Sequence, residues 1–253
     1  MLNLLTLIVM FSSVIPAALS NIFVYPLSKK LCMKVSDYIV KVLAPRVYRI
    51  LHVYSKFNFW GYVESKSILP EKFMVIANHQ SLLDIPTFMN FFPERDVRFV
   101  AKNTLSRHIP LVSEMLRVQE HCMVPRKAKP MVAMQVMEDF GKRTKQKNQI
   151  PILFPEGTRS SDGNVGKFYS AGFRKLSEAY GMPVVVFALD GGYQLKDLKK
   201  ICKNIQNGCY RIKALKTYPC PSTKEECNAI LDEARVLIQN QLDEWRRMES
   251  TER

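Results

Sequence analysis

The sequence lacks the residue spacings of a metal site and of a serine nucleophile. Its six cysteines form no C-x-x-C pair, and the only histidine beside a cysteine is His121, next to Cys122. We therefore expect no bound metal, and we interpret the cysteines as reduced, structural thiols in a cytosolic environment. A G-x-S-x-G nucleophile elbow is absent as well, so the sequence does not point to a covalent serine intermediate.

Internal repeats and low-complexity segments are also missing. Hydrophobic residues make up 47% of the chain and charged residues 24%, which is close to the globular average and excludes a disordered or collagen-like chain. The length of 253 residues allows one large domain or two small ones. A domain of this size buries enough surface to be stable without disulfides.

Acidic residues are few, with 23 against 37 basic residues and a formal net charge of +14. Such an excess suits nucleic acid, an anionic membrane surface, or an acidic carrier or substrate. The basic residues are concentrated behind an apolar N-terminal segment, and no recognisable nucleic-acid-binding motif is present. We therefore expect no nucleic-acid partner.

The first 28 residues contain no charged side chain. As a helix, residues 2–21 would be about 30 Å long, enough to cross a hydrocarbon core, although Pro16 would kink it. A kinked hairpin that enters only one leaflet and a cleaved signal peptide are the alternatives. Because Lys29, Lys30 and Lys34 follow the apolar run and no basic residue precedes it, the positive-inside rule favours an anchor with the next domain in the cytoplasm.

A basic amphipathic helix is predicted behind this segment, ending near Pro45. Its charged positions recur at helical spacing: Lys30, Lys34, Asp37 and Lys41. Such a helix suits an anionic lipid surface, and the alternative is the ordinary solvated face of a globular domain. We predict a membrane anchor with an amphipathic helix over residues 1–56, and a catalytic domain over 57–253.

Short apolar runs bounded by turn signals are predicted as strands: 57–63, 73–77, 97–101, 122–124, 150–154, 183–189 and 210–217. Helical patterns follow several of them: 81–91, 130–145, 172–180 and 223–248. This alternation indicates an α/β fold with a mostly parallel central sheet flanked by helices.

The first group of chemically useful residues is Asn78-His79-Gln80-Ser81-Leu82-Leu83-Asp84, directly after a predicted strand. Ligands of open α/β sheets bind at the carboxyl ends of the strands. On one continuous helix His79 and Asp84 would be about 140° apart, so they meet only if His79 lies in the turn before the helix. Asp84 would then fix the tautomer of the ring and leave its other nitrogen as a base. The alternative is a capping box in which Asp84 serves only the helix.

The second group, Phe154-Pro155-Glu156-Gly157-Thr158-Arg159-Ser160, also follows a predicted strand. Gly157 permits a close approach of the backbone, and Thr158 supplies a hydroxyl. Arg159 carries a planar guanidinium that suits a phosphate. The alternative is a surface turn that carries an ion pair.

Together, and in this order, the two motifs resemble the glycerolipid acyltransferase family, and within it the small bacterial 1-acylglycerol-3-phosphate O-acyltransferases. The similarity covers about residues 57–192. It implies that His79 is the general base and Asp84 its orienting partner. It also implies an acceptor site formed by these residues, with Arg159 on the phosphate: Glu156, Gly157, Thr158 and Arg159. Two further basic residues match family positions and are candidates for the same phosphate, with a solvated surface charge as the alternative: Lys102 and Arg126.

The resemblance implies acyl transfer from acyl-CoA or acyl carrier protein to the sn-2 hydroxyl of 1-acylglycerol-3-phosphate, giving phosphatidic acid in phospholipid biosynthesis. It implies no cofactor or metal. The expected partners are membrane phospholipids, lysophosphatidic acid and acyl carrier protein. The expected location is a membrane, the inner membrane in a bacterium, with the catalytic domain on the cytoplasmic face. Two alternatives stay open: another acceptor, such as glycerol 3-phosphate or a different lysophospholipid, and a non-catalytic lipid-binding protein at the membrane surface.

The sequence departs from the family pattern in three places. The second conserved block of the family commonly starts with glycine, and this chain has Glu120 there. The block after the Glu-Gly-Thr-Arg motif usually reads Phe-Lys-Lys-Gly, and here it is Phe168-Tyr169-Ser170-Ala171. The last block ends in Val186 instead of a second proline. The histidine and aspartate are unaffected, so these departures concern the acceptor, the acyl length and the donor.

Overall fold

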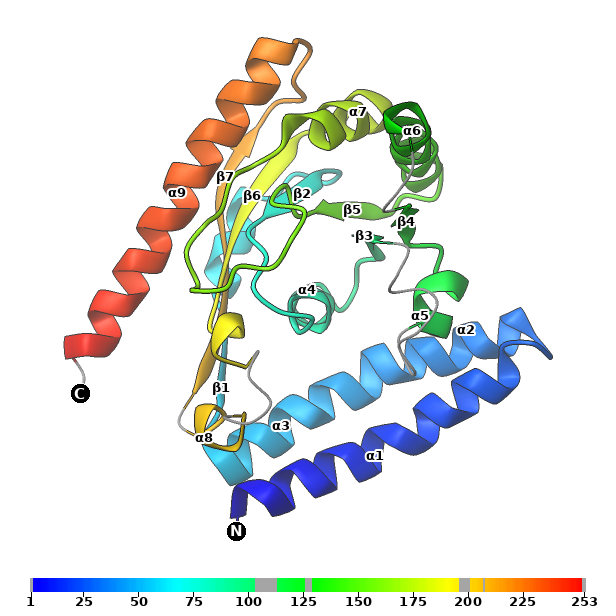
Figure 1. Cartoon of the computed structure of the whole chain (residues 1–253), viewed down its shortest axis with the longest axis vertical. Helices are drawn as coiled ribbons and strands as arrows, with labels where there is room; N and C mark the ends of the chain where they lie inside the picture. The colour runs from blue at the N-terminus through cyan, green and yellow to red at the C-terminus, as the bar shows by residue number, and fades with distance from the viewer. Residues whose placement is uncertain (1, 103–112, 126–128, 196–200, 207, 252–253) are drawn as a thin grey trace.

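The computed structural model describes residues 2–102, 113–125, 129–195, 201–206 and 208–251 (Figure 1). Its centre is a seven-stranded sheet with the order β1-β7-β6-β2-β5-β3-β4. The strands are β1 (Asn58–Gly61), β2 (Met74–Ala77), β3 (Val97–Lys102), β4 (Cys122–Val124), β5 (Ile150–Leu153), β6 (Val184–Asp190) and β7 (Cys209–Tyr218). These strands confirm the runs predicted from the sequence, with ends that shift by one or two residues.

The sheet is mostly parallel, as predicted. All pairs of neighbouring strands are parallel except β6 and β7, which run antiparallel. The described part of the β6–β7 connection holds only two short helices, η4 (Gly192–Leu195) and α8 (Ile201–Asn204). Antiparallel neighbours need no crossover to the other end of the sheet, and β7 returns directly beside β6.

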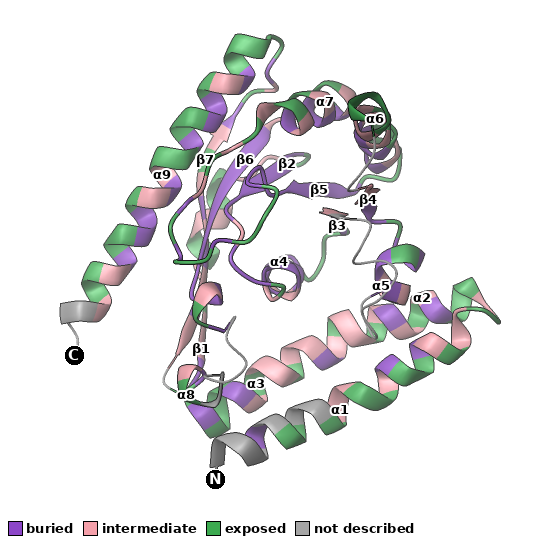
Figure 2. Cartoon of the chain, viewed as in Figure 1, coloured by how far each residue is buried: buried purple, intermediate pink, exposed green. Residues whose placement is uncertain are grey.

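Helices cover both faces of the sheet. They include α4 (Asp84–Phe91), α5 (Ser113–Val118), α6 (Pro130–Gln146), α7 (Ser170–Tyr180) and α9 (Lys224–Thr251). Alternate residues of β2 enter two separate hydrophobic cores: Val75 lies in the core with Phe88 of α4, and Ile76 lies in the core with Phe173 of α7 and Trp245 of α9. Because both of its faces are covered, β2 is buried at every position (Figure 2).

The N-terminal segment forms a helical hairpin made of α1 (Leu2–Val24), α2 (Lys29–Tyr38) and α3 (Ala44–Ser55). The prediction that the amphipathic helix ends near Pro45 is wrong. A π-helical turn over Ile39–Leu43 joins α2 to α3, and Pro45 lies in the first turn of α3, where a missing N–H breaks no helical hydrogen bond. Leu51 of α3 belongs to the same core as Val75. A domain boundary at residue 56 stays a prediction.

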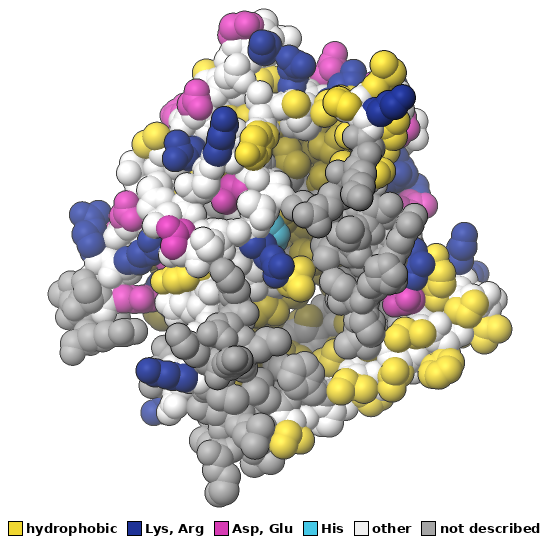
Figure 3. Space-filling model, in the orientation of Figure 1, with side chains coloured by type: hydrophobic (Ala, Val, Ile, Leu, Met, Phe, Trp, Pro, Cys, Tyr) yellow, Lys and Arg dark blue, Asp and Glu magenta, His cyan; other side chains and the backbone are white. Residues whose placement is uncertain are grey.

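The outer surface of this hairpin is rich in apolar side chains, which gather over α1 and α2 at the lower right of Figure 3. Within the described residues, no helix combines the length and the apolar character needed to cross a bilayer.

Glu120 adopts a left-handed backbone conformation, with φ of 56°. Glycine reaches this region at little cost, which gives a physical reason for a glycine at the start of this block. In this chain the Glu120 carboxylate pairs with Lys147, and its carbonyl oxygen accepts from Arg143 at 2.6 Å. Arg143 lies in the last turn of α6 and Lys147 is its C-cap residue, so Glu120 ties that helix end to the start of β4.

His121 is buried and links β3 to the N-terminal hairpin. Its Nδ1 accepts from the Phe99 amide at 3.0 Å, its Nε2 lies 3.2 Å from Gln119 Oε1, and Gln119 Nε2 donates to Asp37 on α2 at 3.3 Å. Burial, reinforced by the charges of Arg98 and Arg143, lowers the pKa of His121 to about 3 from an ordinary 6.5. His121 is therefore neutral in the folded protein at every pH above that value.

We expect this neutral histidine to make the fold sensitive to acid. Below pH 6.5 the unfolded chain binds a proton at His121 that the folded chain does not, so the free energy of unfolding falls as the pH is lowered toward 3, by at most about 1.4 kcal/mol per pH unit. Urea unfolding of the wild type at about pH 7 and pH 5 measures this loss. In His121→Asn, whose amide oxygen can still accept from Phe99, the loss should be smaller. His52→Asn, at an exposed histidine of α3, is the control and should lose as much unfolding free energy as the wild type. Equal losses in all three proteins would contradict this account.

Candidate active site

Two polar loops meet where β2 and β5 end. These strands pair in parallel, with Val75 opposite Ile152 and Ile76 opposite Leu153, so the loops that follow them start side by side. The first loop carries His79 and the second carries Glu156. The carboxyl ends of the strands therefore bring together the two motifs that were singled out in the sequence.

The second motif holds His79 from three sides. The His79 amide donates to Glu156 Oε1 at 2.9 Å, and the Ser160 amide donates to the His79 carbonyl oxygen at 2.7 Å. The imidazole stacks on the Phe154 ring, with 4.3 Å between the ring centroids and 16° between the planes. Both the backbone and the ring of His79 are thus fixed by residues about 77 positions further along the chain.

Asp84 holds the histidine and the turn before the helix at the same time. Its Oδ2 lies 2.5 Å from His79 Nδ1 and also accepts from the amides of Gln80 at 2.8 Å and Ser81 at 3.1 Å. Asp84 is fully buried and is the first residue of α4, so His79 lies in the turn before the helix, as the spacing predicts. The bond at Nδ1 leaves Nε2 as the nitrogen that an incoming hydroxyl can reach.

Glu156 is engaged entirely with backbone groups. Its Oε1 accepts from His79 and its Oε2 accepts from the Gly166 amide at 3.0 Å. Burial raises the pKa of this carboxyl, and the two hydrogen bonds act in the opposite direction. Glu156 therefore fixes the positions of both loops.

Gly157 and the two residues after it form an exposed turn. Gly157 has φ of 61°, which explains a glycine here, and its amide donates to the Phe154 carbonyl oxygen at 3.0 Å. That amide is therefore not free to bind a developing oxyanion. The next two amides, of Thr158 and Arg159, have no partner within the described part of the chain.

A largely apolar cavity of about 440 Å³ opens beside His79. Its polar lining comes from His79, Thr158 and Arg159. Its apolar lining comes from the sheet and from α6 and α7, and includes Phe99, Val124, Met137, Leu153 and Phe173. An apolar chain with a polar end fits such a space, with its polar end next to the imidazole.

The two additional phosphate candidates lie at the limit of what the structure describes. Arg126 lies outside the described residues. For Lys102 the backbone is described, as the last residue of β3 opposite Val124, and its side chain is not. Both assignments stay predictions.

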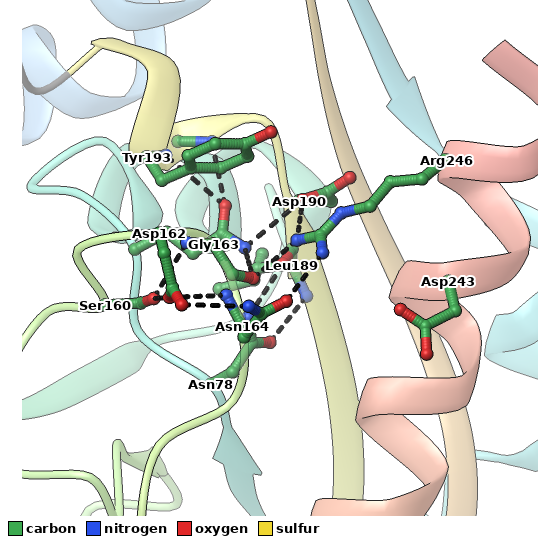
Figure 4. Close-up of polar contacts among 12 residues, drawn as sticks. Asn78, Ser160, Asp162, Gly163, Asn164, Leu189, Asp190, Tyr193, Asp243 and Arg246 are labelled. Atoms are coloured by element: carbon green, nitrogen blue, oxygen red, sulfur yellow. Dashed lines mark hydrogen bonds and ion pairs between the residues drawn. The ribbon is translucent and has the colours of Figure 1, made fainter. Parts of the chain in front are cut away.

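The loop after the second motif is fastened by a residue of α9 (Figure 4). Within the loop, Ser160 Oγ donates to Asp162 at 3.1 Å and accepts from the Gly163 amide at 3.0 Å. Arg246 then donates to the Gly163 carbonyl oxygen at 2.6 Å and to Asn164 Oδ1 at 2.8 Å. The C-terminal helix thereby stabilises the loop that begins with Glu156.

Several site residues were missed from the sequence. Gln80 donates to Asp190 and to the Gly163 carbonyl oxygen, both at 3.2 Å, and joins the first loop to β6 and to the second loop. Asn78 exchanges two hydrogen bonds of 2.8 Å with the backbone of Leu189. Asn78 and Gln80 flank His79 in the first motif, and this position was the only sequence signal for their role. Tyr210 of β7 donates to Asp84 Oδ1, and no local pattern marks it.

The described residues include no group of three or more histidine, cysteine, aspartate or glutamate side chains that could hold a metal ion. The site therefore offers an oriented imidazole, that of His79, beside an apolar cavity that Arg159 also lines.

Curated proteins similar to this chain are acyltransferases. The 1-acyl-sn-glycerol-3-phosphate acyltransferase of Cocos nucifera is 28% identical over 129 residues, which cover 51% of this chain and 41% of that protein. The human 1-acyl-sn-glycerol-3-phosphate acyltransferase beta is 26% identical over 160 residues, 63% of this chain and 55% of that protein. The chain thus spans about half the length of the curated relatives it matches.

A solved structure shares the fold. The crystal structure of the 1-acyl-sn-glycerophosphate (LPA) acyltransferase PlsC from Thermotoga maritima matches with a TM-score of 0.65 and 23% sequence identity, over 97% of this chain and 95% of that one. The family model described as Acyltransferase matches residues 62–190, just over half of the chain, and this segment includes both motifs. The chain belongs to the Acyltransferase family.

Proposed function

We propose that the protein transfers an acyl group from a thioester to the sn-2 hydroxyl of 1-acylglycerol-3-phosphate, giving phosphatidic acid for phospholipid synthesis. The observation that carries this proposal is the 2.5 Å contact between His79 Nδ1 and Asp84 beside the apolar cavity. The names of the relatives from Cocos nucifera and human support the choice of acceptor.

In this reaction His79 Nε2 takes the proton of the acceptor hydroxyl as its oxygen attacks the thioester carbonyl carbon. The tetrahedral intermediate then collapses, the C–S bond breaks, and the departing thiolate takes the proton from the imidazolium. Asp84 keeps the ring oriented and stabilises its positive charge. General-base assistance of this kind contributes about 10²- to 10⁴-fold in rate.

The exposed turn supplies the groups that receive negative charge. The amides of Thr158 and Arg159, which have no partner within the described chain, are the candidates for binding the oxyanion of the tetrahedral intermediate. The Arg159 guanidinium lines the same cavity and suits the phosphate of the acceptor. The apolar remainder of the cavity suits an acyl chain.

The thiol carrier is coenzyme A or acyl carrier protein, and the chemistry at His79 is the same for both. Coenzyme A carries phosphates and acyl carrier protein is acidic, so the net charge of +14 favours the approach of either donor. We propose that no further cofactor takes part.

We also propose that the helical hairpin lies on the membrane with its apolar surface in one leaflet. The burial pattern of α1 and the start of α2 is inverted: polar Asn21 is buried and donates to Ser36 Oγ at 2.9 Å, while large apolar side chains are exposed. These are Ile8, Val9, Ile15, Leu19, Phe23, Leu27 and Leu31. An apolar outer face with basic residues at its edge is the pattern of a helix in the membrane interface. Lys29 and Lys30 favour the cytoplasmic face, which in a bacterium is that of the inner membrane.

Replacing the proposed base should abolish acyl transfer. We expect His79→Ala to lower the rate of lysophosphatidate acylation about 10³-fold, because the hydroxyl loses its proton acceptor. The assay uses membranes or vesicles with lysophosphatidate, other lysophospholipids and glycerol 3-phosphate, each with acyl-CoA and with acyl carrier protein thioester. His52→Ala, at an exposed histidine of α3, is the control. Full activity in His79→Ala would refute the mechanism, whereas preference for another acceptor would refute only the substrate assignment.

Replacing the proposed phosphate ligand should affect binding more than turnover. We expect Arg159→Ala to raise the KM for lysophosphatidate about tenfold, and Arg159→Lys to restore it only partly, because lysine lacks the planar fork. Arg174→Ala, at an exposed arginine of α7 that does not line the cavity, is the matched control. An unchanged KM in Arg159→Ala would place the phosphate elsewhere.

Charges on the apolar outer face should release the protein from membranes. We expect the double change Phe23→Asp and Leu27→Asp to abolish cosedimentation with anionic vesicles, because charged side chains on this face oppose its insertion into the lipid. The two native side chains are 70% and 84% exposed, so replacing them should leave the folded hairpin intact. Val236→Asp with Met248→Asp, at two exposed apolar positions of α9, is the control. Equal binding of both double variants would contradict insertion through the hairpin.

A further inference from the structure

We propose that Tyr210 is a positioning residue for acyl transfer, acting through Asp84. Its hydroxyl comes from β7 and donates to Asp84 Oδ1, while Oδ2 accepts from His79, Gln80 and Ser81. The inference rests on the proposed function of His79. It adds a residue at position 210, beyond the segment 62–190 that the family model matches.

The two oxygens of Asp84 have separate partners. Oδ2 has three donors from its own loop, and within the described chain Tyr210 is the partner of Oδ1. If the Tyr210 hydroxyl were lost, Oδ1 would be a buried charged oxygen without a donor, because Asp84 is fully buried. The carboxylate would then be free to rotate or shift, and the His79 ring would lose its fixed partner.

The direction of this hydrogen bond is set by the surroundings of the phenol. Tyr210 is fully buried, and burial, together with the negative charge of Asp84, raises its pKa well above the ordinary 10. The phenol therefore keeps its proton and acts as the donor. Three other titratable groups face this pair: Tyr48 from α3, Glu156 from the second loop and Asp190 from the end of β6.

Two glycines at the end of β6 make the approach of Tyr210 possible. A Cβ on Gly191, which has φ of 96°, would lie 1.9 Å from the Cys209 carbonyl oxygen. A Cβ on Gly192 would lie 2.4 Å from the Tyr210 hydroxyl and 2.9 Å from Ser81 Cβ. Any larger residue at either position would push β7 or its tyrosine away from Asp84. The pair Gly191-Gly192 thus has a role that the sequence motifs did not reveal.

The chemical effect of this donor has a definite sign. The Tyr210 hydroxyl takes up part of the negative charge of Asp84, so the carboxylate holds the protonated form of His79 less strongly. No proton is transferred from Tyr210 during the reaction. Removing the hydroxyl should therefore loosen the His79 ring, which lowers kcat, and should move the acidic limb of the pH–activity profile to higher pH.

The test measures the kinetics and the pH profile of Tyr210→Phe. We expect kcat to fall about tenfold with little change in KM, and the midpoint of the acidic limb of the pH–activity profile to rise by about 0.5 pH unit. Tyr180→Phe is the matched control. That tyrosine is 3% exposed, and its hydroxyl donates to the Gln149 carbonyl oxygen at 2.8 Å, at the opposite end of β5. Its loss should lower stability without moving the acidic limb.

A second variant keeps the proposal testable if Tyr210→Phe folds poorly. Incorporating 3-fluorotyrosine at position 210 alone retains the hydroxyl and makes it a stronger donor, so the acidic limb should move to lower pH, opposite to the phenylalanine variant. In an Asp84→Asn background, Tyr210→Phe should cause no further loss, because both residues act through the same carboxylate.

Failure of the proposed acyl transfer and failure of the role of Tyr210 give different results. If the wild type shows no acylation of lysophosphatidate, the proposed function fails. If the wild type is active and neither change at position 210 moves kcat or the acidic limb, the role of Tyr210 is refuted while the proposed function stands. Additive losses in the Asp84→Asn background would also overturn the proposal.

Discussion

The buried carboxylate of Asp84 is the constraint on which the site depends. A charge without water costs several kcal/mol unless donors surround it, and Asp84 receives four of them. Two are backbone amides, which fix the shape of the turn before α4. One is the imidazole of His79, and the fourth reaches across from β7. The turn, the start of α4 and the close approach of β7 all follow from the need to satisfy this one group.

The second loop, which begins with Glu156, holds the first loop in place. Both carboxylate oxygens of Glu156 accept hydrogen bonds from backbone amides. Arg246 of α9 connects the continuation of the loop to the C-terminal helix. The polar network therefore has its own supports, while the cavity beside it stays apolar. Polar groups whose oxygens have hydrogen-bond partners therefore lie next to a cavity suited to an acyl chain.

Much of the fold could be predicted because strands that are buried on both faces read as continuous apolar runs, and β2 and β6 are buried throughout. The pairing of His79 with Asp84 could be predicted from their spacing. The helix through Pro45 could not, because proline is tolerated in a first turn, and the boundary depended on a π-helical turn that has no sequence signal. Tyr210 was also hidden. It lies 126 residues from Asp84, and only the antiparallel return of β7 brings the two together.

The stack of Phe154 on the imidazole has a consequence for the direction of attack. One face of the His79 ring is covered at a centroid distance of 4.3 Å, and the lone pair of Nε2 lies in the plane of the ring. In the proposed reaction, an incoming hydroxyl would therefore approach edge-on, along that plane, and not from the covered face. The ring has already given up its rotational freedom when the chain folds, so this loss of entropy does not recur at each turnover.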